Sequence, residues 1–142
     1  TERMRIDSSG NVTKPYQPYL FFRPSCSSSS GNFNLAYETS SRGITVNTST
    51  SKITVSVSGI YMISWQTICT SSSGRNDTFI SVNGTSINSC LNEDNGSGYH
   101  QRTHSFIWQL YANDYITLSN AYWFTPGGSP GTWGNFSMYL LG

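Results

Sequence analysis

Histidine and acidic side chains are the residues of this chain that could bind a metal, but their spacing argues against it. His100 and His104 lie four residues apart, which in a strand places them on one face but about 13 Å apart. We therefore expect surface or interface histidines. Glu93 and Asp94 lie in a polar stretch that lacks the downstream bidentate glutamate of a calcium loop. The sequence predicts a solvated loop there, with no metal and no cofactor.

Serine is abundant, yet its context does not indicate catalysis. The chain contains no G-x-S-x-G elbow, the strand-to-helix turn that exposes a nucleophilic serine in many hydrolases. A depolymerase would need two carboxylates facing each other across a groove, and the adjacent Glu93 and Asp94 do not provide that geometry. We predict that the protein is not an enzyme.

Three cysteines, Cys26, Cys69 and Cys90, form an odd set without CxxC spacing. They make neither a zinc site nor a complete disulfide framework. We expect reduced thiols in the core, with a bridge between Cys69 and Cys90 as the alternative.

Four aromatic residues bracket a stretch rich in proline and glycine: Tyr122, Trp123, Phe124 and Trp133. Aromatic faces in a loop can stack on sugars or anchor a protein partner. The alternative is that they cap the core beneath a long loop. We take them as the candidate receptor-binding loop.

The composition favours one domain of the β-sandwich class. The 142 residues are 36% hydrophobic and 14% aromatic but only 11% charged, which suits outer faces made of Ser, Thr and Asn. A formal net charge of +1 with scattered Lys and Arg gives no electrostatic footprint for nucleic acid or an anionic membrane. No apolar run has the length of a membrane span, so we expect no membrane insertion.

The stretch 51–65 is the element around which the chain is organised. Its apolar residues recur at every second position on both sides of Gly59, which predicts a strand, a bend and a second strand. In the second strand Tyr61, Ile63 and Trp65 share one face, while Ile60 and Met62 make the other face apolar. The final strand, 136–141, is likewise apolar on both faces. Such strands are covered on both sides, and we predict a subunit interface at Ile60, Met62, Tyr139 and Leu141.

Further short strands are predicted at 19–22, 33–37, 44–46, 105–111 and 115–118. Asn83-Gly84 separates two strand-like runs and predicts a hairpin with a type I′ turn. Nine or ten short strands at this spacing indicate an all-β, antiparallel sandwich of jelly-roll or Greek-key type.

Residues 1–18 differ from the rest by their dense charges of both signs, and we interpret them as a connector or the end of a fibre shaft before a head domain at 19–142. The segment Glu2-Arg-Met-Arg-Ile-Asp-Ser-Ser-Gly-Asn-Val12 resembles the "ERMRIDSSGNVGIG" segment of phage tail-fibre and related virion proteins. Thr13-Lys14-Pro15 replaces the usual Gly-Ile-Gly continuation. The abrupt start indicates a piece of a longer polypeptide.

Four blocks of the head, in order, resemble the complement q-type and tumour necrosis factor superfamily. The block 51–65 is similar to "GKFT-x-P-x-x-G-x-Y-x-F", and 80–84 to the "L-x-x-N-G" hairpin. The block 110–118 is similar to "L-x-x-G-D-x-V-x-L", and 136–141 to the terminal "F-S-G-F-L-L". Two family glycines are replaced, by Asn113 and by Met138, and the acidic residues that hold calcium in some members cannot be placed.

The resemblance implies a jelly roll of about ten strands that assembles as a threefold homotrimer. Together with the connector it implies the head or tip of a phage tail fibre or other virion appendage, attached to the rest of the fibre through residues 1–18. Its partner would be a glycan or protein receptor on the host surface. The alternative is a secreted complement-like or cytokine-like ligand of the same fold, which would be extracellular.

Overall fold

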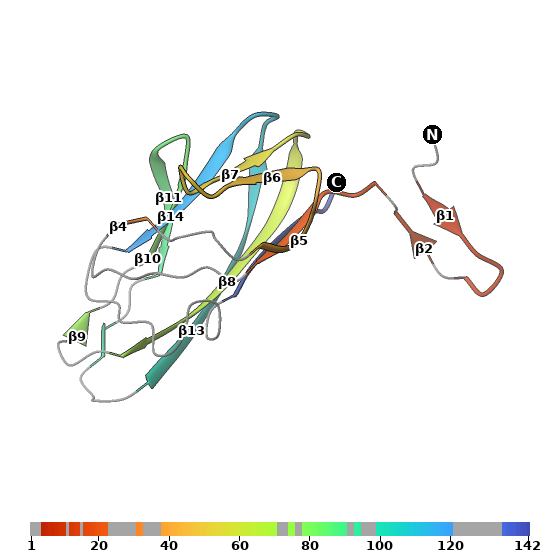
Figure 1. Cartoon of the computed structure of the whole chain (residues 1–142). Coiled ribbons are helices and arrows are strands. Elements are labelled where there is room, and N and C mark those ends of the chain that lie inside the picture. The colour runs from red at the N-terminus through yellow and green to blue at the C-terminus, as the bar shows by residue number, and fades with distance from the viewer. Residues whose placement is uncertain are drawn as a thin grey trace.

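The computed structural model describes residues 4–10, 12–14, 16–22, 31–32, 38–70, 74–75, 78–90, 93–94, 99–120 and 135–142. In these residues the regular structure is strand (Figure 1). No helix long and apolar enough to cross a membrane occurs in the part of the chain that is described.

One sheet contains five strands in the order β13-β8-β15-β3-β5, and all its pairs are antiparallel. Its members are β3 (Tyr19–Phe22), β5 (Glu38–Arg42), β8 (Gly59–Thr70), β13 (Tyr99–Leu110) and β15 (Asn135–Leu140). The predicted strand after Gly59 is β8, an interior strand with β13 on one side and β15 on the other. The strand β13 begins well before the predicted 105, because it pairs with β8 along its whole length from Tyr99 to Leu110.

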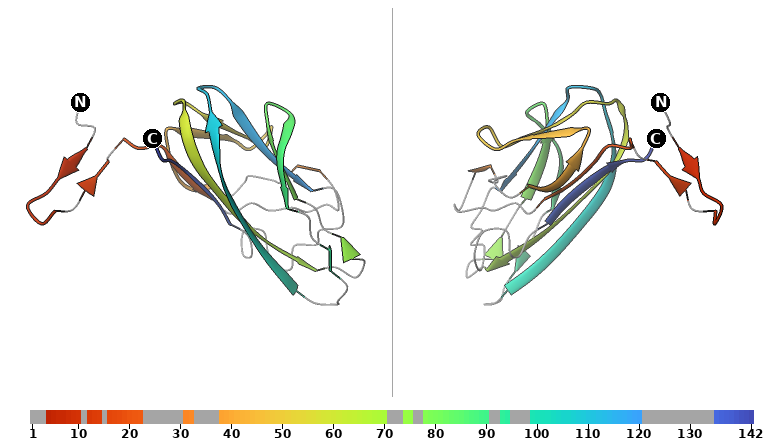
Figure 2. Two further views of the ribbon diagram at one scale, coloured as in Figure 1. Left: turned by 180° about the vertical axis from the view of Figure 1, so that it is seen from behind. Right: turned by 45° about the vertical axis from the view of Figure 1, so that its right-hand side comes forward.

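The other sheet follows the order β11-β10-β14-β7-β6, with the short β4 paired to β14. Its members are β4 (Gly31–Asn32), β6 (Ile44–Asn47), β7 (Lys52–Val55), β10 (Thr78–Val82), β11 (Thr85–Cys90) and β14 (Tyr115–Asn120). The two sheets lie face to face, as Figure 2 shows from behind. This arrangement confirms the predicted antiparallel jelly-roll sandwich of about ten strands.

The core lies between the two sheets and consists of residues that alternate along the strands and so share the inward face. Every second residue of β8 is buried there: Tyr61, Ile63 and Trp65. Phe22 of β3 and Phe136 of β15 pack beside them, and the ring centroids of these two phenylalanines lie 5.1 Å apart. The second sheet contributes Ile53, Val55, Ile80, Ile116 and Leu118. Met138, where the resemblance expects glycine, is a fully buried member of this core.

The turns follow the residue types that favour positive φ. Asn83 and Gly84 have φ of 51° and 83°, the left-handed pair that the Asn-Gly hairpin predicts. Asn113 has φ of 74°, so it occupies the turn position at which the resemblance expects glycine. Asparagine is the residue that tolerates this conformation best after glycine, which explains the replacement.

The N-terminal segment forms a small hairpin of β1 (Arg5–Ile6) and β2 (Val12–Thr13). The amide of Ser9 donates to the Asp7 carboxylate at 2.9 Å, and Gly10 closes the turn with φ of 82°. Figures 1 and 2 show the hairpin standing clear of the two sheets, beside the C-terminus.

One sequence prediction is corrected. Glu93–Asp94 is not a solvated loop but the strand β12, paired with β9 (Gly74–Arg75). His104, predicted to be a surface or interface residue, is partly buried, and its ring lies 4.6 Å from that of Trp65 on the core side of β13. Its neighbour on the same face, Phe106, packs edge-on against Trp65. The predicted strand at 33–37 lies outside the described residues, as does Cys26.

Candidate functional site

The candidate site is the surface of the β13-β8-β15-β3-β5 sheet that faces away from the second sheet, which we call the outer face. The four predicted interface residues lie together on it. Ile60, Tyr139 and Leu141 are 45%, 43% and 41% exposed, and Met62 is partly buried. Three of the four are therefore open to solvent in the single chain, although Ile60, Met62 and Tyr139 belong to strands whose other face is core.

Strand register brings these residues side by side. Met62 of β8 lies opposite Tyr139 of β15 on one side and Ile107 of β13 on the other. Directly opposite residues have Cβ atoms about 4.5–5.5 Å apart, so the three side chains form one cross-strand row. Leu141 continues past β15, where its amide donates to the carbonyl of Ile60 at 2.7 Å. We call Ile60, Met62, Ile107, Tyr139 and Leu141 the apolar half of the outer face.

Ile107 was not among the predicted interface residues, although it is 58% exposed. The sequence places it on the face opposite Phe106 and Trp108. Only the pairing of Ile107 with Met62, which is set by the β8–β13 register, shows that it joins the apolar half.

The same face becomes polar further along the strands. Ser64 lies between Ser105 and Ser137, and the Ser105 hydroxyl donates to that of Ser64 at 2.8 Å. In the next row the Asn135 amide donates to the side-chain carbonyl of Gln66 at 2.8 Å. Along β8, β13 and β15 the outer face is thus divided, with an apolar half near the C-terminus and polar rows beyond it; on β3, Phe21 is 39% exposed opposite Ser137.

A second apolar area lies along the edge of this sheet. Among the described strands β13 pairs only with β8, so its far side is an unpaired edge of the kind that proteins usually cover. Trp108 of β13 is 40% exposed, and Tyr111, the first residue after the strand, is 65% exposed. The Trp108 ring packs against Phe106, with centroids 6.4 Å apart.

The apolar half of the outer face carries no side chains suited to catalysis or metal binding. In the described part of the chain, no group of three or more His, Cys, Asp or Glu side chains could hold a metal ion. It consists instead of isoleucine, methionine, leucine and tyrosine side chains. The predicted receptor-binding residues Tyr122, Trp123, Phe124 and Trp133 lie outside the described residues, so their role stays a prediction.

Comparison with known proteins identifies the fold. No family model matches this chain, and no curated protein sequence matches it. Crystal structures of murine APRIL at pH 8.0 and pH 5.0 superpose with TM-scores of 0.65 and 0.67 at 16% and 14% identity, and each covers 88% of this chain and 99% of the APRIL chain. The structure of Eiger TNF from S. frugiperda superposes with a TM-score of 0.69 at 11% identity, covering 89% of this chain and 93% of that one. The sandwich is therefore a jelly roll of the tumour necrosis factor type.

Proposed function

We propose that this chain is the head of a homotrimer and acts as a non-enzymatic binding module. The proposal is carried by one observation: four apolar side chains of β8, β13 and β15, with Leu141 just after β15, lie in adjacent rows on a face that the described part of the chain leaves largely open. Fully burying a large aliphatic or aromatic side chain contributes about 1.5–3 kcal/mol. A face with this many such residues is expected to be covered by protein rather than water.

The edge of β13 is the surface that fits against the outer face. It exposes Trp108 and Tyr111, while the outer face exposes Ile60, Tyr139 and Leu141. When one patch of a chain contacts a different patch of the next copy, the contact is head-to-tail. Such contacts close into a ring of three if each copy is rotated by a third of a turn from the last. Three copies would bury both the apolar half and the unpaired edge of each chain. The fold shared with APRIL and Eiger TNF supports this assembly.

A charge substitution on the outer face tests the trimer. Tyr139→Glu is expected to give a folded monomer, because it places a carboxylate in the buried contact. The control is Thr85→Glu at an exposed position of β11, which should remain trimeric. Light scattering measures the mass, and circular dichroism checks that both variants are folded. A monomeric parent chain at micromolar concentration would reject the proposal.

The trimer is proposed to attach to a receptor through repeated loops. Three identical loops around one axis bind a repetitive surface more tightly than one, because the second and third contacts are intramolecular. The aromatic residues at 122–124 and Trp133 are the proposed contact. Trp133→Ala is expected to abolish binding to cells or glycans while the mass stays that of a trimer. Unchanged binding would count against this contact.

The proposed setting is the tip of a phage tail fibre or other virion appendage, with a glycan or protein of the host surface as receptor. The resemblance of residues 2–12 to a tail-fibre segment favours it. A secreted complement-like or cytokine-like ligand is the second candidate, and the fold shared with APRIL and Eiger TNF favours that one. Labelled protein imaged on bacterial and on animal cells separates the two, and collagen-like repeats encoded upstream would support the second.

A further inference from the structure

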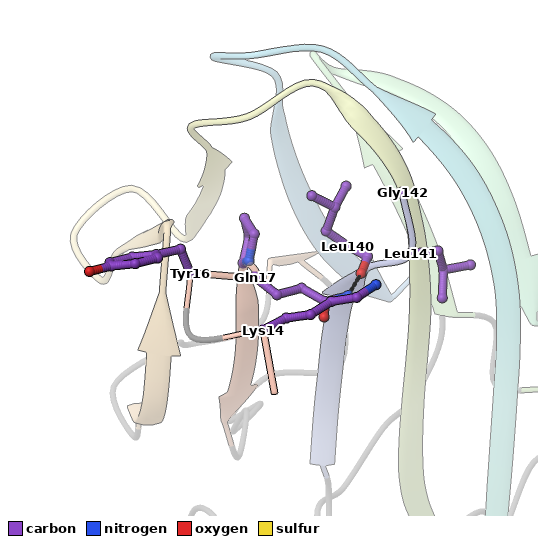
Figure 3. Close-up of a pocket in the computed structure, with 7 residues that line it drawn as sticks. Lys14, Tyr16, Gln17, Leu140, Leu141 and Gly142 are labelled. Atoms are coloured by element: carbon purple, nitrogen blue, oxygen red, sulfur yellow. Dashed lines mark hydrogen bonds between the residues drawn. The ribbon is translucent and has the colours of Figure 1, made fainter. Parts of the chain in front are cut away.

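A hollow of about 280 Å³ lies where the N-terminal segment meets the end of β15 (Figure 3). Its lining comes from both ends of the chain: Lys14, Tyr16, Gln17, Pro18, Leu140, Leu141 and Gly142. The walls are held together, because the Gln17 side-chain amide donates to the carbonyl of Leu140. The amide of Leu140 in turn donates to the carbonyl of Pro18 at 3.0 Å. The hollow is therefore preformed, with leucine and proline among its walls.

The β1–β2 hairpin has an exposed apolar face of its own. Met4, directly before β1, and Ile6, at its end, are 54% and 62% exposed, and in extended chain their spacing of two residues places them on the same face. Each strand of the hairpin has only two residues, and among the described residues they pair only with each other. A lone two-stranded hairpin is marginal in water, so a hairpin with this face needs a surface to pack against.

The hairpin is poorly placed to fill the hollow of its own chain. β2 ends at Thr13, and the next residue, Lys14, already lines the hollow. A turn follows, in which the amide of Gln17 donates to the carbonyl of Lys14 at 3.1 Å. To reach the hollow, Ile6 would have to fold back over Lys14 and Tyr16, which form its wall. Figures 1 and 2 show the hairpin directed away from the sheets instead.

We propose that the hairpin of each copy docks into the hollow of a neighbouring copy, placing Met4 and Ile6 against Tyr16 and Leu141. This inference rests on the proposed trimer. Leu141 belongs both to the hollow and to the apolar half of the outer face, so the docking site is continuous with the proposed subunit contact. The hollow is lined by the C-terminal residues, and the hairpin lies beside the C-terminus in Figure 1, so threefold symmetry would gather three of each around one end of the axis. The hairpin is then an exchanged clamp that locks the trimer.

Dilution of the trimer tests the clamp. Ile6→Ser is expected to raise the concentration at which half the trimer dissociates by about tenfold or more, because it replaces an isoleucine that the proposed docking would bury in each copy. Ile6→Leu preserves the apolar side chain and is the matched control. Equal dissociation of Ile6→Ser and the parent trimer would overturn the clamp and leave the trimer standing. A monomeric parent chain would overturn both.

Engineered cysteines identify the partner of the hairpin. Chains carrying Ile6→Cys and chains carrying Tyr16→Cys are co-expressed with different tags and oxidised, and the parent chain treated in the same way gives the background of the native cysteines. Tyr16 is suitable because it lines the hollow and is 63% exposed. A covalent dimer joining one chain of each kind, mapped by mass spectrometry, is expected. A bridge only between two chains that both carry Ile6→Cys, or no bridge, would overturn the proposal.

Discussion

Asn113 shows how a single residue allows the turn after β13. Its φ of 74° lies in the left-handed region, which costs most residues other than Gly and Asn about 1–2 kcal/mol. The turn is also fixed by Asp114, whose carboxylate accepts from the amide of Tyr111 at 2.8 Å and from the side-chain amide of Asn83 at 2.7 Å. Through these hydrogen bonds, Asp114 links the turn after β13 to the β10–β11 hairpin.

Substitutions at Asn113 should separate backbone strain from lost contacts. Asn113→Ala is expected to lower the free energy of unfolding by about 1 kcal/mol, because alanine disfavours positive φ. Asn113→Gly relieves the strain and should be close to neutral. Unfolding in urea measures both variants. If the two lose the same stability, the side chain of Asn113 rather than its backbone conformation is what matters.

Tyr61 should make stability fall at high pH. It is fully buried, its hydroxyl donates to the carbonyl of Val57 at 2.8 Å, and burial raises its pKa above the ordinary value of 10.0. Because the folded state holds this proton more tightly than the unfolded state, the contribution is complete below pH 10.0 and is lost as the pH rises through the pKa of the folded state.

We expect Tyr61→Phe to cost about 0.5–1.5 kcal/mol near neutral pH through the lost hydrogen bond. Its disadvantage should shrink as the pH rises from about 8 to about 11, because phenylalanine does not titrate. Urea unfolding of parent and variant across this range measures the difference. A difference that stays constant with pH would contradict the raised pKa.

At the scale of elements, the start of β8 depends on the close approach of the C-terminal residues. The amide of Ile60 donates to the carbonyl of Gly142 at 3.0 Å, and the next hydrogen bond joins Leu141 back to Ile60. Gly59 has no side chain at this contact. A Cβ there would lie 2.4 Å from a methyl carbon of Leu140 and 2.9 Å from the carbonyl oxygen of Gly142.

Gly59→Ala is therefore expected to lower the free energy of unfolding by about 1–3 kcal/mol, as overpacking typically does. It should also displace residues 140–142 and with them one wall of the hollow. Ser86→Ala, at an exposed position of β11, is the control and should change stability little. Thermal unfolding measures both. A Gly59→Ala variant as stable as the control would mean that the C-terminal residues move aside without cost.

Strands with strict alternation could be predicted from the sequence, and irregular pairings could not. The two-residue period around Gly59 separated Ile60 and Met62 from Tyr61, Ile63 and Trp65, but which set faces inward was not settled by the sequence; the structure buries the set of Tyr61. The Asn83-Gly84 turn was equally predictable because its φ angles require those residue types. The start of β13 at Tyr99 was missed, because its first half is polar and its extent is set by pairing with β8. The addition of Ile107 to the site depends on the same long-range register, which no local pattern encodes.

At the scale of the whole molecule, the proposed assembly is driven by apolar contact rather than by charge. The chain has 8 Lys and Arg against 7 Asp and Glu, and the apolar half of the outer face contains no ionisable residue except Tyr139. Salt screens interactions between charges but does not weaken the burial of apolar surface. The association should therefore be nearly independent of ionic strength.

We expect the concentration of half-dissociation to change by less than about threefold between about 50 mM and about 500 mM sodium chloride, whereas an assembly held by ion pairs would weaken steeply over this range. Because the folded chain is stabilised by its partners, the midpoint of thermal unfolding should also rise with protein concentration. Sedimentation equilibrium measures the first effect and calorimetry the second, with Tyr139→Glu as the variant whose midpoint should not depend on concentration. Steep weakening by salt would mean that charged residues outside the apolar half hold the copies together, and an unchanging midpoint for the parent chain would mean that each head is stable alone.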